Sequence, residues 1–154
     1  MKSKCWITGL IAGVLLIQLW GCAGNRYQQR VDVVKEQVSS FYQHLESRHT
    51  DQAIFANQRI EQVALESQEY LLRRVGQMSQ AERAQEWKVI KIAKETAAEN
   101  WLALAQYFMG IRDYKRARGT YKRLIEVYKD SAFQSYVNRA ETGLRDLDLA
   151  LPPE

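Results

Sequence analysis

The chain has 154 residues, the size of one domain, and 46% of them are hydrophobic while 26% are charged, which argues against wholesale disorder. The formal net charge of +4 falls to 20 basic against 18 acidic residues without Lys2 and Lys4, so nucleic acid is not an expected partner. The two prolines lie at Pro152 and Pro153, and Ala, Glu, Gln, Arg, Lys and Leu dominate the centre. This composition predicts an all-α fold.

The first predicted element is an export signal over residues 1–21. The two lysines precede an apolar run over residues 6–19. Its length suits the hydrophobic region of a signal peptide and is shorter than the roughly 20 residues that cross a bilayer. The run leads into Leu19-Trp20-Gly21-Cys22. An uncleaved N-terminal anchor is the alternative.

This ending resembles the lipobox of bacterial lipoproteins, in which Leu19, Gly21 and Cys22 take the expected places. The resemblance implies that Cys22 begins the mature protein and carries a diacylglycerol thioether and an N-acyl chain, with no other cofactor expected. An Asp after the cysteine would resemble an inner-membrane retention signal, but Ala23 stands there. The resemblance therefore favours a location at the periplasmic face of the outer membrane, and the inner membrane is the alternative. Because Cys5 leaves with the signal, no disulfide is expected.

A short polar tether over 22–26 is expected to precede a hairpin of two helices over 27–77. Apolar residues recur at helical spacing in both halves, and Thr50 or Asp51 is available as an N-cap between them. Gly76 is expected to stop the second helix. A coiled coil is the alternative, but the break between the stripes favours a hairpin. The first stripe comprises Tyr27, Val31, Val34, Val38, Phe41 and Leu45, and the second begins with Ala53, Ala56, Ile60 and Val63.

Further helices are predicted over 78–150. Ser79 and Glu82 fit a capping box that opens a helix running to Gly110, although Asn100 could divide it. Asp113 is expected to cap the next helix. Asp130 or Ser131 would then cap a last helix over 131–149.

Residues 98–131 resemble one tetratricopeptide repeat, a pair of antiparallel helices with characteristic small and aromatic positions. The residues that fit are Trp101, Leu104, Ala105, Phe108, Ala117 and Tyr121. Lys129 departs from the proline that usually ends the repeat, and Leu124 replaces a usual alanine. The resemblance covers about a quarter of the chain and implies antiparallel helical hairpins in a short array, with 131–149 as its capping helix. The whole is also similar to envelope lipoproteins that carry such repeats.

In such a repeat the first helix faces a concave groove. The resemblance therefore implies that Glu99, Leu102, Gln106 and Met109 contact a bound peptide or helix. The alternative is that the N-terminal hairpin packs over this face.

Two further patterns have both a functional and a structural interpretation. Basic residues are frequent on the helix after Asp113. Arg116, Lys122 and Arg123 form a candidate docking face for an acidic partner or for lipid head groups. The alternative is that they form a solvated surface.

Tyrosines at every seventh position favour core packing over a peptide-binding strip. These are Tyr107, Tyr114, Tyr121 and Tyr128.

No catalytic or metal-binding pattern emerges. His44 and His49 do not share a helical face and have no cysteine beside them. We therefore expect a lipid-anchored periplasmic adaptor, not an enzyme, that binds protein partners during assembly of an envelope complex. The first alternative is a structural lipoprotein that self-associates through the stripe that begins at Tyr27; an enzyme accessory is the second.

Overall fold

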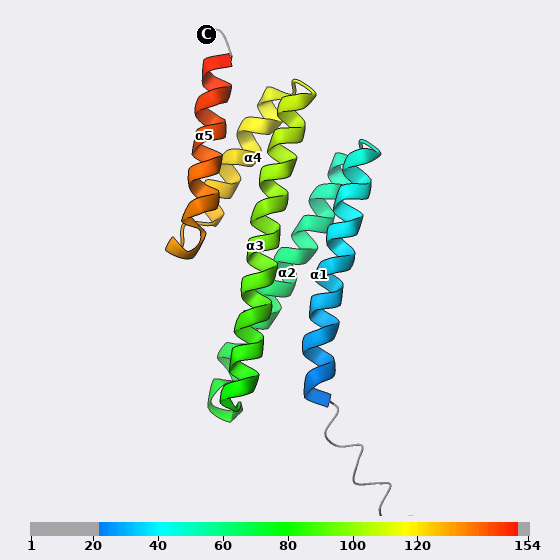
Figure 1. The fold of residues 1–154 in the computed structure, drawn as a ribbon, viewed down its shortest axis with the longest axis vertical. Coiled ribbons are helices and arrows are strands. Elements are labelled where there is room, and N and C mark those ends of the chain that lie inside the picture. Colours follow the sequence, from blue (N-terminus) through cyan, green and yellow to red (C-terminus); the bar gives the residue numbers. More distant parts are fainter. Residues whose placement is uncertain (1–21, 151–154) are drawn as a thin grey trace, which may run out of the picture.

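In a computed structural model, which describes residues 22–150, the chain forms five packed antiparallel helices (Figure 1). No strand occurs within this described range, and the predicted all-α class is confirmed. The helices are α1 (Cys22–Glu46), α2 (Thr50–Arg74), α3 (Gln80–Gly110), α4 (Tyr114–Val127) and α5 (Gln134–Ala150). Short 3₁₀ turns cover Val75–Gln77 and Ser131–Phe133.

The predicted signal peptide over 1–21 lies outside the described residues, and so does the side chain of Cys22. Of the helices that are described, none combines the length and apolarity needed to span a membrane. The backbone of 22–26, which we expected to be a short polar tether before the first helix, is the first part of α1. No proline separates this segment from the stripe beginning at Tyr27, so the helix extends back through it.

The long helices α1, α2 and α3 pack together, and α4 and α5 lie against the second half of α3 (Figure 1). The predicted stripes supply this core: Val34 and Phe41 of α1 are buried, as are Ala53 and Ile60 of α2. Burial of such apolar surface is the main force that holds amphipathic helices together. The stripe of α1 is therefore used within the chain, as a hairpin requires.

Two of the interhelical turns have the same geometry. Arg48 and Arg112 each adopt a left-handed backbone, with φ of 62° and 61°. The amide of His49 then donates to the carbonyl of His44 at 2.8 Å, and that of Asp113 donates to the carbonyl of Phe108 at 2.9 Å. These bonds satisfy carbonyls that the helix ends leave unpaired. The hairpins α1–α2 and α3–α4 thus turn in the same way.

The predicted caps of α3 and α4 are present. Ser79 and Glu82 form the reciprocal capping box, with bonds of 3.2 and 2.7 Å, and the bond from the Ser79 amide holds the pKa of the Glu82 carboxyl below its usual value. The Asp113 carboxylate accepts from the amide of Arg116 at 3.1 Å. Helix α3 continues unbroken through Asn100, whose side chain is buried against its neighbours.

Candidate partner-binding groove

A groove lies between α3 and α5, with α4 beneath it. It encloses about 530 Å³ and is lined by three of the four residues singled out from the repeat pattern, Leu102, Gln106 and Met109. The opposite wall comes from α5, and the floor includes Tyr121 of α4. The residues that α5 contributes are Asn138, Arg139, Thr142, Gly143 and Asp146.

The floor of the groove is apolar and its walls are polar. Leu102 is 1% exposed and Tyr121 is 4% exposed, so both form part of the core as well as the floor. Burial, with the nearby Asp146 carboxylate, raises the pKa of the Tyr121 hydroxyl and keeps it neutral. Gln106 and Asn138 are exposed on opposite walls. Such a channel can take an apolar side chain while the two amides hydrogen-bond the backbone of a partner.

Gly143 is a groove residue that the sequence pattern did not single out. A Cβ built at this position would lie 2.4 Å from Cζ of Tyr121, closer than two non-bonded carbon atoms approach. The absence of a side chain therefore lets α5 pack over the tyrosine ring. A single glycine inside an amphipathic helix is the signal that could have pointed to this close approach.

Glu99 does not line the groove and instead joins its two walls. Its carboxylate accepts two hydrogen bonds from the Arg139 guanidinium, at 2.7 and 2.9 Å. This pairing raises the pKa of Arg139. Because both side chains are about half exposed, the pair contributes little stability.

The helix that partly covers the predicted groove face is therefore α5. The alternative interpretation placed the N-terminal hairpin over Leu102 and Met109, but the lining of the groove comes from α3, α4 and α5. Gln106 remains exposed and Met109 is half-buried. The open part of the groove thus lies near the end of α3.

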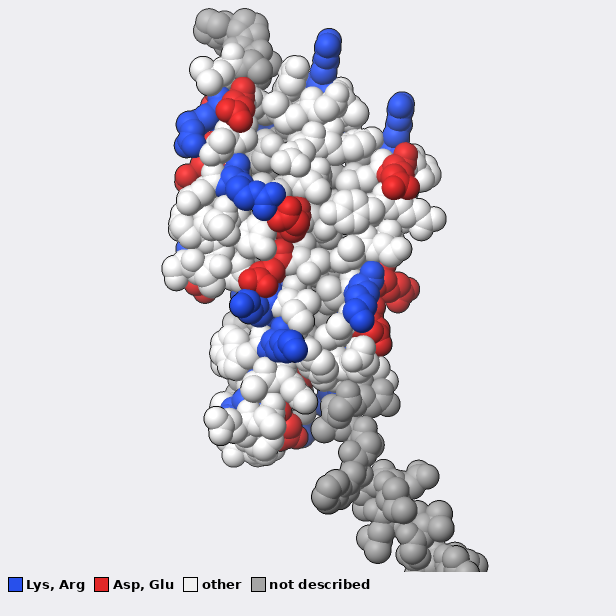
Figure 2. Space-filling model, in the orientation of Figure 1, with Lys and Arg blue, Asp and Glu red and all other residues white. Residues whose placement is uncertain are grey.

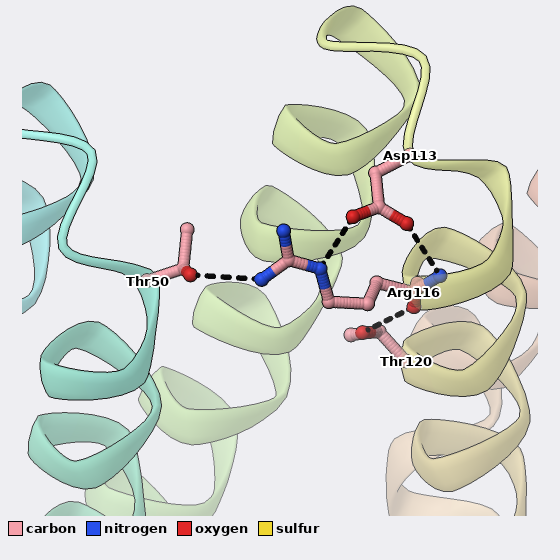
Figure 3. Close-up of polar contacts among 4 residues, drawn as sticks. All are labelled: Thr50, Asp113, Arg116 and Thr120. Atoms are coloured by element: carbon pink, nitrogen blue, oxygen red, sulfur yellow. Dashed lines mark hydrogen bonds and ion pairs between the residues drawn. The ribbon is translucent and has the colours of Figure 1, made fainter.

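Arg116, predicted as a docking residue, makes several contacts within the chain (Figure 3). Its guanidinium pairs with Asp113, and one terminal nitrogen donates to the Thr50 hydroxyl at 3.1 Å. The same group lies 4.6 Å from the centre of the Phe108 ring. Arg116 therefore links the start of α4 to the start of α2 and the end of α3.

The other two predicted docking residues differ from each other. Arg123 pairs with Glu61 of α2 at 2.9 Å and stacks 4.6 Å above the Trp101 ring. Lys122 is exposed, and no ion pair of this residue occurs within residues 26–149. Positive and negative side chains are interspersed on the face that Figure 2 shows. Because Arg116 and Arg123 are each paired with a carboxylate of the chain, the three predicted residues do not form one free cationic surface.

We expect the substitution Arg116→Ala to lower the free energy of unfolding by about 1 kcal/mol, because it removes a cation–π contact and an interhelical hydrogen bond. Lys122→Ala serves as the matched control on the same helix and should change stability by less than about 0.5 kcal/mol. Urea denaturation followed by circular dichroism measures both. Equal effects would show that the contacts of Arg116 add nothing.

The recurring tyrosines pack inside the fold. Tyr121 and Tyr128 are buried, while Tyr107 and Tyr114 are half-buried against the hydrophobic core. This placement agrees with the core interpretation of the seven-residue spacing and gives no continuous aromatic strip.

A polar cluster around Glu61 was not apparent from the sequence. Its carboxylate accepts hydrogen bonds from Trp101 Nε1 at 2.8 Å and from the Tyr128 hydroxyl at 3.0 Å, in addition to the Arg123 pair. Burial and the adjacent Glu61 carboxylate raise the pKa of Tyr128 well above its usual value. The Glu61 side chain of α2 thus contacts one side chain of α3, one of α4 and one of the residue that follows α4.

Within the described range, no group of three His, Cys, Asp or Glu side chains lies close enough together to hold a metal ion. Comparison of the chain with protein-family models, with curated proteins and with solved structures gave no match. The likeness of 98–131 to a tetratricopeptide repeat therefore rests on the residues themselves. The aromatic and small residues that carry it, from Trp101 to Tyr121, are all buried.

Proposed function

We propose that the protein is a lipid-anchored adaptor of the bacterial envelope, whose groove between α3 and α5 binds a segment of a partner protein. The observation that carries this proposal is the convergence of Leu102, Gln106 and Met109 in one groove. These residues were singled out from the repeat pattern alone. An anchor at Cys22 places the protein at the periplasmic face of the outer membrane and raises its local concentration there.

Recognition would use both the floor and the walls of the groove. The apolar floor between Leu102 and Tyr121 takes one aliphatic or aromatic side chain of the partner. Gln106 and the Nδ2 group of Asn138 then hydrogen-bond the flanking backbone of an extended segment, since Oδ1 of Asn138 already accepts from Gln134 at 2.8 Å. Such a contact is small, so the two-dimensional confinement that the lipid provides is an essential part of the affinity.

Self-association through α1 is the less favoured function. The residues that would form its contact stripe, including Val34, Phe41 and Leu45, are buried against the other helices of the same chain. A second copy could reach them only if the bundle opened. The buried stripe therefore favours the adaptor over a structural lipoprotein that self-associates.

Site-specific photo-crosslinking in cells tests the groove. A photoreactive amino acid at position 106 is expected to crosslink to the same small set of envelope proteins in repeated captures. Position 43, an exposed glutamine of α1, is the matched control and should not capture this set. The groove substitution Asn138→Arg should abolish the crosslinks from position 106 while leaving the unfolding midpoint within a few degrees.

Each outcome decides between the hypotheses. Crosslinks from position 106 that depend on Asn138 support the adaptor. Capture of the same proteins from position 43, or crosslinks indifferent to Asn138→Arg, would remove the groove from the proposal. Capture of the chain's own copies alone would favour the self-associating structural lipoprotein.

A further inference from the structure

The start of α1 and the turn between α2 and α3 lie at the same end of the bundle, opposite the α1–α2 and α3–α4 turns (Figure 1). A side-chain contact confirms that the two segments adjoin. The Arg26 guanidinium of α1 lies 5.1 Å from the centre of the Tyr70 ring of α2. Any chain preceding Cys22, including the apolar run over 6–19, therefore joins the fold at this end.

Arginines gather at this end beside three glutamates: Glu69 pairs with Arg73, Glu86 pairs with Arg30, and Glu82 lines the same pocket as Arg26. Besides Arg26, the guanidinium groups of Arg30 and Arg74 lie 5.3 and 5.7 Å from the Tyr70 ring. Arg30 is paired with Glu86. Arg26 and Arg74 are exposed, and neither has an ion-pair partner among the described residues. Two exposed cations thus lie within 6 Å of the centre of one aromatic ring.

Apolar side chains project into solvent beside these cations. Leu72 is 68% exposed and Val75 is 48% exposed, and Arg73 and Arg74 lie between them in the sequence. The carbonyl of Val75 accepts a hydrogen bond from the guanidinium of Arg83, which brings a further arginine to the turn. Exposed aliphatic residues flanked by arginines suit the boundary between lipid head groups and acyl chains.

We propose that this end of the bundle rests on the anionic lipid surface, an inference that depends on the proposed anchoring at Cys22. Leu72 and Val75 enter the head-group layer, while Arg26, Arg74 and Arg83 bind lipid phosphates. The position of the anchor makes the membrane the surface that this end meets first. Electrostatic attraction between these arginines and the lipid phosphates then orients the bundle.

The proposed contact gives the α3–α5 groove a defined place. Helix α1 has 25 residues, and at 1.5 Å per residue it spans about 37 Å from the membrane end to the opposite end. Gln106 and Met109, which line the groove, lie in the last two turns of α3. That end of α3 is opposite the start of α1 (Figure 1). The orientation would therefore present the groove to the periplasm rather than to the lipid.

Thiol accessibility in the full lipidated chain tests this contact. Leu72→Cys is compared with the control Phe55→Cys, which is 63% exposed and lies near the opposite end of α2. Each variant is placed in nanodiscs of phosphatidylcholine with a minority of phosphatidylglycerol, and a water-soluble maleimide is added. Labelling at position 72 should slow about tenfold relative to detergent, and labelling at position 55 less than twofold.

The charge requirement has its own control. Replacing Arg26 and Arg74 with Gln should restore rapid labelling at position 72, whereas Arg145→Gln, an exposed arginine on α5, should not. Equal labelling of positions 72 and 55 in a chain whose mass shows acylated Cys22 would overturn the surface contact alone. A mass without acyl chains would overturn the anchoring and, with it, this inference.

Discussion

Replacing Glu61 with Ala is expected to lower the free energy of unfolding by about 3 kcal/mol. The substitution leaves the Arg123 guanidinium, the Tyr128 hydroxyl and the Trp101 indole without their shared acceptor. These donors are partly or fully buried, so water replaces the lost bonds poorly. The effect should be far larger than that of an ordinary helix-surface carboxylate.

Glu66→Ala is the matched control for this prediction. Glu66 lies on the same helix, is exposed, and accepts one hydrogen bond, at 3.0 Å from Gln62. Its removal should cost less than about 0.5 kcal/mol. Glu61→Gln, which keeps an acceptor but loses the charge, should fall between the two. Urea denaturation measures all three, and similar values for Glu61→Ala and Glu66→Ala would show that the cluster does not hold the helices together.

The helices were predictable because each depends on local patterns. The stripe through Val34 and Phe41 marks the buried face of α1, and Ser79 with Glu82 marks the start of α3, whatever the rest of the chain does. The role of Glu61 was not predictable in this way. In the sequence Glu61 looks like any solvent-exposed carboxylate on the polar face of α2. The residues that donate hydrogen bonds to it are distant in the sequence.

The helix ends were also predicted only in part from local sequence patterns. Gly76 and Gly110 were the expected stop signals, yet neither has a positive φ, and the left-handed residues are Arg48 and Arg112. A left-handed arginine costs roughly 1–2 kcal/mol, which the 6→1 hydrogen bonds and the packing of the next helix must offset. Helix α3 does end at the predicted Gly110, so residue preference located the end of this helix but not the residue that takes the left-handed backbone.

The candidate groove was predictable in part. The repeat pattern placed Leu102, Gln106 and Met109 on one face of α3, because helical spacing fixes which side chains share a face. It did not show that α5 forms the other wall or that Glu99 pairs with Arg139. Those features depend on how α5 docks, which the helical period of α5 does not specify.

Gly143→Ala is expected to destabilise the protein by about 2 kcal/mol, although alanine favours helices over glycine by about 1 kcal/mol. The added methyl group would lie 2.4 Å from Cζ of Tyr121, and because that ring is 4% exposed, its end must shift against the residues packed around it. Overpacking therefore outweighs helix propensity at this position. Stability is measured as the free energy of unfolding in urea.

Gly119→Ala gives the opposite sign and makes the test sharp. Gly119 also lies inside a helix, α4, but a Cβ there would meet no atom within 4 Å. Only the higher helix propensity of alanine then matters, and the free energy of unfolding should rise by about 0.5–1 kcal/mol. In a Tyr121→Ala background the space above α4 is empty, so Gly143→Ala should also become stabilising. A Gly143→Ala protein as stable as the parent chain would mean that α5 does not pack against Tyr121, and the groove would lose the wall that its proposed function needs.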